Sequence, residues 1–258
     1  MRCFLFWTLT VLTAVNVCAK TPDADELHRR VKRSGGEVII QRIPSVSAKR
    51  NYCVPASVDM VLRYYDTRVG QRTLGKLFDS SKKNGTYSRN IVKEFGKGEL
   101  SGFRCEIVYG MLQQELERLI ELYTNSPELK RSVRKKFKKQ LSKSDTFFDP
   151  MDPGIVRKFT PQARKELLAV FPKILKTFID RGCPLLWCVI MNFDPHDRTD
   201  GGHMRVIAGY EEKDGKITRI IYLDPWSNKR KFKEMKYMDA VTETTLILAV
   251  IPDSIANQ

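Results

Sequence analysis

Cys53 lies where a hydrolase would place a nucleophile, at the start of a stretch with helical periodicity. Apolar residues then recur at i, i+4, i+7, i+8 and i+11, the spacing of an amphipathic helix: Val54, Val58, Val61, Leu62 and Tyr65. Pro55 fits only the first turn of such a helix, so Cys53 is predicted at its N-terminus. The free amides and positive dipole end there favour a thiolate, which predicts a lowered thiol pKa. The alternative is a buried cysteine acting as a small hydrophobe.

A histidine and a carboxylate come from the other end of the chain. Residues 203–210 and 217–223 are strand-like, and a polar turn containing Asp214-Gly215 joins them. A hairpin centred just before Asp214 puts His203 opposite Asp224, whereas centring it on Asp214-Gly215 moves the partner of His203 to Trp226. Of the three histidines in the chain, only His203 lies on a predicted strand.

Together these residues have the order of a papain-like cysteine hydrolase. The imidazole of His203 would take the proton of the Cys53 thiol, and Asp224 would fix the imidazole tautomer and stabilise its protonated form. Transglutaminase-like and acyltransferase chemistry follows the same logic.

Several segments carry a resemblance to a known family. They are Ile43-Pro44, Asn51-Tyr52-Cys53, Arg63-Tyr64-Tyr65, Gly182 through Trp187, Gly201 through Arg205, Gly209-Tyr210 and Tyr222 through Trp226. In these segments the chain resembles the family thirty-nine-like cysteine peptidases, relatives of the bacteriocin-processing, double-glycine peptidases. The resemblance implies a papain-like fold acting on a peptide or protein substrate, with Cys53 as nucleophile, His203 as base and Asp224 as orienting carboxylate.

One feature of that family is missing. Its members place a glutamine shortly before the cysteine, where the side-chain amide helps to form the oxyanion hole, but residues 47–51 contain no glutamine. One such donor typically contributes about 2.7–4 kcal/mol to catalysis. Ser47, Lys49 and the backbone amide of Cys53 are the candidate substitutes. The alternative function is a catalytically weak or inactive pseudoenzyme, acting as a cationic secreted binding protein.

The first residues predict a secreted or luminal protein. Residues 1–19 have the basic start, apolar centre and small-residue end of a signal peptide, with cleavage after Ala19. Residues 20–33 end in Arg30-Val31-Lys32-Arg33 and are interpreted as a propeptide, cut by a convertase-type protease between Arg33 and Ser34. The alternative is a charged tail. A single papain-like peptidase domain would then span residues 34–258.

The cysteines allow at most one disulfide beside a free nucleophile. Without Cys3 and Cys18, which lie in the signal peptide, a bridge from Cys105 to Cys183 or Cys188 is the expected pairing, and a fully reduced set is the alternative. No CxxC or His-rich metal spacing appears, so no metal or cofactor is predicted. Asn84-Gly85-Thr86 is a glycosylation sequon.

The chain carries a formal charge of +15, and much of it lies between Lys130 and Lys143. Apolar residues recur every four positions there, which predicts an amphipathic helix with a basic face. The face is either simply solvated or attracts an anionic glycan, membrane surface or acidic substrate. No nucleic-acid partner is expected in a secreted chain without a known binding module. Basic residues 229–236 would favour acidic substrates near the site.

The predicted fold class is α+β, with a helical N-terminal lobe packed on a C-terminal antiparallel sheet. A strand over 38–43 precedes the Cys53 helix, and mostly helical segments follow to residue 180. These include residues 111–123 and a helix from Thr160-Pro161 to Gly182. The strands of the sheet are predicted over 184–191, 203–210, 217–223 and 245–251.

Overall fold

The structure is a computed structural model that describes residues 21–49, 51–81, 86, 88–110, 161–191, 201–227 and 231–256. Its strands are β1 (Val31–Ser34), β2 (Glu37–Ile40), β3 (Phe103–Gly110), β4 (Leu185–Met191), β5 (Gly201–Lys213), β6 (Lys216–Leu223), β7 (Lys233–Lys236) and β8 (Thr244–Pro252). Its helices are α1 (Ala24–Arg29), α2 (Cys53–Tyr64), α3 (Gln71–Leu77), α4 (Ser88–Glu94), α8 (Pro161–Ile179) and α9 (Tyr237–Glu243), with a 3₁₀ turn at Gly98–Leu100.

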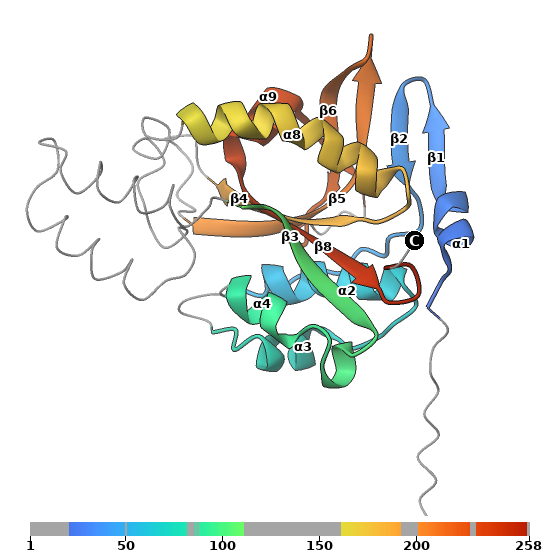
Figure 1. The fold of residues 1–258 in the computed structure, drawn as a ribbon. Helices are drawn as coiled ribbons and strands as arrows, with labels where there is room; N and C mark the ends of the chain where they lie inside the picture. Colours follow the sequence, from blue (N-terminus) through green and yellow to red (C-terminus); the bar gives the residue numbers. More distant parts are fainter. Residues whose placement is uncertain are drawn as a thin grey trace, which may run out of the picture.

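The strands form one antiparallel sheet with the order β1-β2-β5-β4-β8-β3, and β6 branches from β5 to carry β7. Helices α8 and α9 lie on one side of this sheet, and α2, α3 and α4 lie on the other (Figure 1). The core fills both interfaces. All nine residues of β8 are buried, because this strand is covered by helices and paired on both edges.

The α+β class is confirmed, and so are the four C-terminal strands, with ends shifted by a few residues. The expected separation of a helical lobe from a later sheet is wrong, since β1, β2 and β3 join the same sheet. The first predicted strand ends at Ile40, not at residue 43. This strand, β2, pairs with β5 beside Gly209. A Cβ atom at position 209 would lie 2.3 Å from the Val38 carbonyl oxygen, so the close approach of the two strands requires glycine there.

The segment before residue 34 is part of the folded domain. Leu27 of α1 is fully buried. Arg30 donates to Glu26 and to the Tyr64 carbonyl oxygen, and its Nη2 lies 3.1 Å from Asp66 Oδ2. This helix and its arginine anchor the N-terminal segment to the end of α2.

The expected cleavage point lies inside that segment. Arg33 and Ser34 are exposed, but they belong to β1 and pair with Val38 and Glu37 of β2. Gly35 and Gly36 have positive φ and form the tight turn between the strands, rather than a loose linker. The described residues before Ser34 therefore pack with the rest of the domain.

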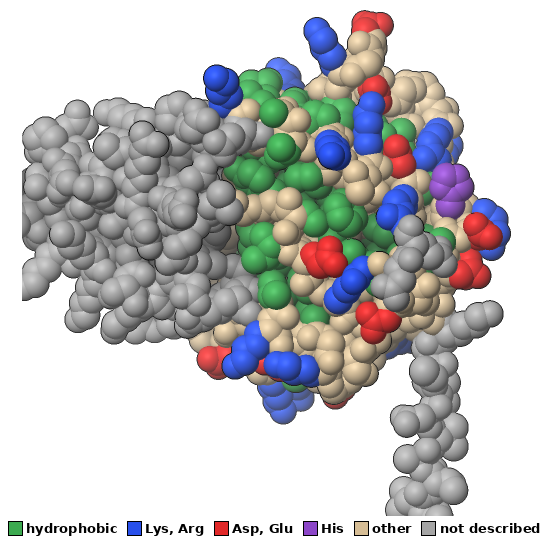
Figure 2. All heavy atoms as spheres, viewed as in Figure 1, with side chains coloured by type: hydrophobic (Ala, Val, Ile, Leu, Met, Phe, Trp, Pro, Cys, Tyr) green, Lys and Arg blue, Asp and Glu red, His purple; other side chains and the backbone are tan. Residues whose placement is uncertain are grey.

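Several sequence predictions fall outside the described residues. These are the signal peptide, the sequon residue Asn84, the helix over 111–123 and the basic segment Lys130–Lys143. In the described residues, no helix has the length and apolarity that crossing a membrane requires. On the face drawn in Figure 2, apolar side chains gather across the middle, and basic side chains are interspersed with acidic ones around them.

Candidate active site

Cys53 is the first residue of α2, as predicted. Tyr52 occupies the N-cap position without a side-chain hydrogen bond, and Pro55 has no N–H to offer. The backbone amides of Cys53 and Val54 approach the Cys53 sulfur, and so does the backbone of Met204 on β5. The thiol thus lies against the residue that follows His203.

A buried serine fixes α2 to β5. Ser57, one helical turn after Cys53, is fully buried, and its hydroxyl donates to the Met204 carbonyl oxygen at 3.0 Å. The ladder between β5 and β6 begins only at Val206, so the edge of β5 beside Met204 is open to the helix. The chain thereby brings the nucleophile to the strand that carries the histidine.

The hairpin of β5 and β6 turns at Asp214-Gly215, so the second of the two predicted registers is correct. That register puts Trp226 opposite His203, and their rings lie 4.0 Å apart between centroids. Strand β6 ends at Leu223, and the chain turns there, so Asp224 also reaches His203. The distance from His203 Nε2 to Asp224 Oδ1 is 3.0 Å.

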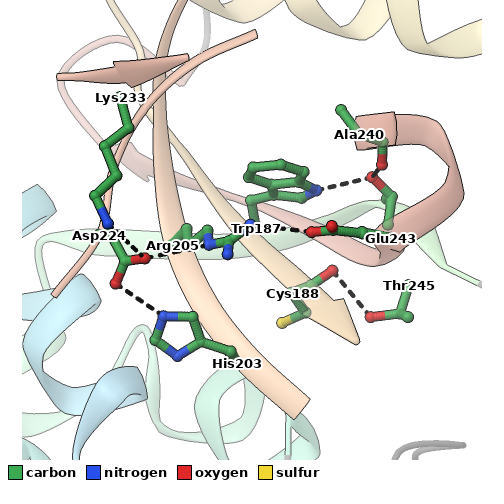
Figure 3. A network of polar contacts seen from close by, with 10 residues as sticks. Trp187, Cys188, His203, Arg205, Asp224, Lys233, Ala240, Glu243 and Thr245 are labelled. Atoms are coloured by element: carbon green, nitrogen blue, oxygen red, sulfur yellow. Dashed lines mark hydrogen bonds and ion pairs between the residues drawn. The ribbon is translucent and has the colours of Figure 1, made fainter. Parts of the chain in front are cut away.

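The two oxygens of Asp224 have different partners (Figure 3). Oδ1 accepts from His203 and from the Trp226 backbone N–H at 2.9 Å. Oδ2 faces two cations, Arg205 Nε and Lys233 Nζ, each at 3.5 Å. Burial alone would raise the pKa of Asp224, but the hydrogen bonds and the nearby positive charges hold it well below its usual range. Asp224 is therefore an anion at neutral pH.

An ionised Asp224 places the imidazole proton on Nε2, which leaves Nδ1 as an acceptor. Nδ1 is buried and has no hydrogen-bond partner among the described residues. Burial lowers the pKa of His203 against the opposing effect of Asp224, so the ring is neutral at rest.

The predicted low pKa of Cys53 is wrong. Burial raises the pKa of the Cys53 thiol, although the backbone amides around the sulfur oppose this shift. No hydrogen bond joins the sulfur to Nδ1 in the part of the chain that is described. The resting pair is a thiol and a neutral imidazole. Burying a thiolate and an imidazolium costs more free energy than the backbone amides at the helix terminus recover.

The sequence model of the Peptidase_C39 like family matches residues 162–245 of the chain. This match supports a C39-like peptidase family assignment. The matched range contains His203 and Asp224 but not Cys53. No curated protein matches the chain. The match to this family model suggests a peptidase-related function.

The two oxyanion candidates predicted in place of the family's glutamine, Ser47 and Lys49, lie exposed on the loop before α2. The Ala48 N–H donates to the Pro225 carbonyl oxygen at 2.7 Å, which ties this loop to the Asp224 turn. Gln71, at the start of α3, clamps the loop on its other side. Its side chain donates to the Ser47 carbonyl oxygen at 2.8 Å and accepts from the Lys49 N–H at 3.3 Å.

Three features add to the site that was predicted from the sequence. They are the Gln71 clamp, the Arg205 ion pair and the ring contact of Trp226 with His203. The spacing of Gln71 gives no signal, because it contacts residues more than twenty positions earlier. Arg205 follows His203 by two positions on one strand, so alternation alone could have placed both on the same face.

The remaining cysteines do not form the expected bridge. Cys105, Cys183 and Cys188 are free, as is Cys53. Cys105 lies opposite Val250 in the β3–β8 ladder. In the described ranges, no group of three or more His, Cys, Asp or Glu side chains could hold a metal ion.

Proposed function

We propose that the protein is a cysteine peptidase that hydrolyses peptide bonds with Cys53, His203 and Asp224. One observation carries the proposal. His203 is buried, and its Nε2 is bound by Asp224 while its Nδ1 has no hydrogen-bond partner among the described residues. The next residue of its strand touches the Cys53 thiol. A histidine with one nitrogen fixed and the other held as an acceptor is what a general base requires.

The reaction starts from neutral groups. As the Cys53 sulfur attacks the substrate carbonyl carbon, its proton passes to Nδ1 of His203, and Asp224 stabilises the imidazolium. The carbonyl oxygen becomes an oxyanion near the backbone amides of Cys53 and Val54 at the helix terminus. The imidazolium then protonates the leaving amine, and the thioester is hydrolysed by a water that His203 deprotonates.

Ser47 and Lys49 complete this proposal as candidate oxyanion donors. The loop that carries them is fixed between Gln71 and Pro225, so their side chains start from a defined backbone. Donors placed in advance stabilise the transition state more effectively than donors that must be ordered during the reaction.

A diverse peptide library read by mass spectrometry tests the proposal. The wild type should cleave some members, and Cys53→Ala should cleave none. Cys183→Ala is the matched control, because it also removes a buried thiol but one that contacts Tyr65 and not the site. A folded wild type that cleaves no peptide, or a Cys53→Ala variant that retains cleavage, refutes the proposal.

A second candidate is a pseudoenzyme that serves as a cationic binding protein. The exposed Ser47 and Lys49 side chains and the absence of a hydrogen bond from the thiol to Nδ1 favour it. Introducing the family's glutamine at position 47 or 49 distinguishes the two candidate functions. A rise in turnover supports the peptidase, whereas inactivity in all variants supports the binding protein.

The setting of this activity is also a proposal. The apolar start of the chain supports secretion or delivery to a lumen, and the run from Lys130 to Lys143 supports contact with an anionic glycan or membrane surface. Glycosylation at Asn84 belongs to the same setting. Cleavage between Arg33 and Ser34 is proposed only for chains in which β1 has not yet paired with β2.

A further inference from the structure

Arg205 is a buried cation beside the candidate triad. It lies on β5, two residues after His203, and is 7% exposed. Its guanidinium carbon lies 5.5 Å from the ring centroid of Trp187 and 4.9 Å from that of Tyr222. Aromatic faces attract a desolvated guanidinium, so the two rings stabilise the charge in this position.

The surroundings of Arg205 fix its position. Nη1 donates to Glu243 Oε2 of α9 at 3.1 Å, and Nε faces Asp224 Oδ2 at 3.5 Å. The Trp187 ring is held in turn, because its Nε1–H donates to the Thr244 hydroxyl at 2.8 Å. Arg205 therefore joins α9 to the carboxylate that orients His203 (Figure 3).

Lys233 gives an internal comparison for Arg205. Its Nζ lies at the same 3.5 Å from the same oxygen of Asp224 and donates a hydrogen bond to it, whereas Arg205 Nε makes an ion pair but no hydrogen bond with a described residue. The side chain of Lys233 is 43% exposed, against 8% for Arg205. A lysine ammonium on a flexible exposed stem is a mobile and hydrated charge. A buried arginine packed against two rings is a fixed charge.

We propose that Arg205 is a positioning residue that holds Oδ2 of Asp224, so that Oδ1 stays against His203 Nε2. Its effect on turnover rests on the proposed peptidase function. Its effect on the geometry of Asp224 and His203 does not.

The direction in which the pKa of His203 changes when Arg205 is removed distinguishes a positioning role from a purely electrostatic one. The charged and titratable groups around the pair include Arg205 on β5, Cys53 on α2, Lys233 on β7 and Tyr222 on β6, with Glu243 reached through Arg205. If Arg205 acted only by its charge, removing it would raise the pKa of His203, because a nearby cation disfavours the imidazolium. If Arg205 positions Asp224, its removal lets the Asp224 carboxylate move toward Lys233. The buried His203 imidazole then loses its contact with the carboxylate. The pKa of His203 then falls.

Histidine NMR in the full-length Cys53→Ala protein tests this without any substrate. The chain has three histidines, so His203 is assigned with His28→Gln and His196→Gln. In Arg205→Met, the downfield Nε2–H resonance of His203 should disappear, and the pKa of His203 should fall. In the matched Lys233→Met variant, that resonance should remain.

Arg205→Lys is the second variant, in case the methionine variant does not fold. It keeps the charge but cannot reach both Asp224 and Glu243 with a planar fork, so the same resonance should broaden or disappear. A retained resonance with an unchanged or raised pKa of His203 in the folded variants overturns the proposal.

Peptide turnover provides a second, independent test of the positioning role. On a peptide that the wild type cleaves, Arg205→Met should lower kcat about 100-fold with little change in KM, the effect of a misplaced catalytic group. A loss of the His203 resonance in a protein whose wild type cleaves nothing supports the positioning role and refutes the peptidase. An unchanged resonance and kcat refute the positioning role alone.

Discussion

Asp224→Asn is the sharpest perturbation of the site, because an amide cannot satisfy both sides of this position. With its oxygen toward His203 and the Trp226 N–H, the NH₂ group would face Arg205 and Lys233, a donor against two cations. With the amide reversed, the NH₂ group would oppose the Trp226 N–H and accept no proton from Nε2. His203 would then carry its proton on Nδ1, where it could no longer take one from Cys53.

The expected magnitudes follow from these contacts. A wrong tautomer in a triad costs about 10⁴-fold in kcat, or roughly 5.4 kcal/mol of transition-state stabilisation. Removing one partner of a buried ion pair costs about 3 kcal/mol of unfolding free energy, the low end of the usual range, because Arg205 keeps Glu243. In a domain of this size, that corresponds to a fall in Tm of roughly 6–12 °C.

A fluorogenic peptide assay and thermal unfolding followed by circular dichroism measure the two effects. Asp180→Asn is the control, because Asp180 accepts from Tyr210 at 2.8 Å and pairs with Arg33, away from the triad's contacts. It should keep the wild-type kcat. An Asp224→Asn protein with kcat within about tenfold of the wild type would refute the assigned role of Asp224.

Further predictions concern titration, packing, the loop and processing. Burial lowers the pKa of His203 and raises that of Cys53. The kcat/KM profile should therefore be flat between about pH 6.5 and 8.5, and limbs inside that window would contradict this. The unfolded chain protonates His203 first, so denaturant titrations should show stability falling as pH drops below about 6.5. Ser57→Ala should lose about 1–3 kcal/mol of unfolding free energy in urea, because a buried acceptor loses its donor. Gln71→Ala should lower kcat more than KM in the peptide assay, and equal changes in both would count against a fixed loop. A dibasic-specific protease should cut after Arg33 in urea but spare the folded protein, as mass spectrometry would show.

The sequence was sufficient for the parts of the site that depend on local pattern. Proline in the first turn located Cys53 at a helix start, and alternation located the strand that carries His203 and the strand that ends just before Asp224. The hairpin register was uncertain by two residues, and the structure shows why this did little harm. Strand β6 ends just before Asp224, so both alternative partners contact His203.

The remaining features depend on burial and long-range contact. The helix terminus predicted an acidic thiol, but the depth of Cys53 decides the direction of its pKa shift, and depth is not written in local spacing. The short strand β1 is polar and exposed, so no apolar alternation marks it. Strand β3 lies in a region that was expected to be helical, and it is fixed by pairing with β8 about 145 residues later.

The position of β8 has a consequence for synthesis of the chain. The last described strand fills an interior place in the sheet, between β4 and β3, so neither neighbour is fully paired until it has been made. Ser57 and Met204, which join the nucleophile helix to the histidine strand, are 147 residues apart. At about 5–20 residues per second, the ribosome needs roughly 7–30 s to make the second after the first. Contacts so distant in sequence form late in folding. A nascent or truncated chain therefore carries Cys53 without its base, and the site forms only in a chain that is long enough to close its sheet.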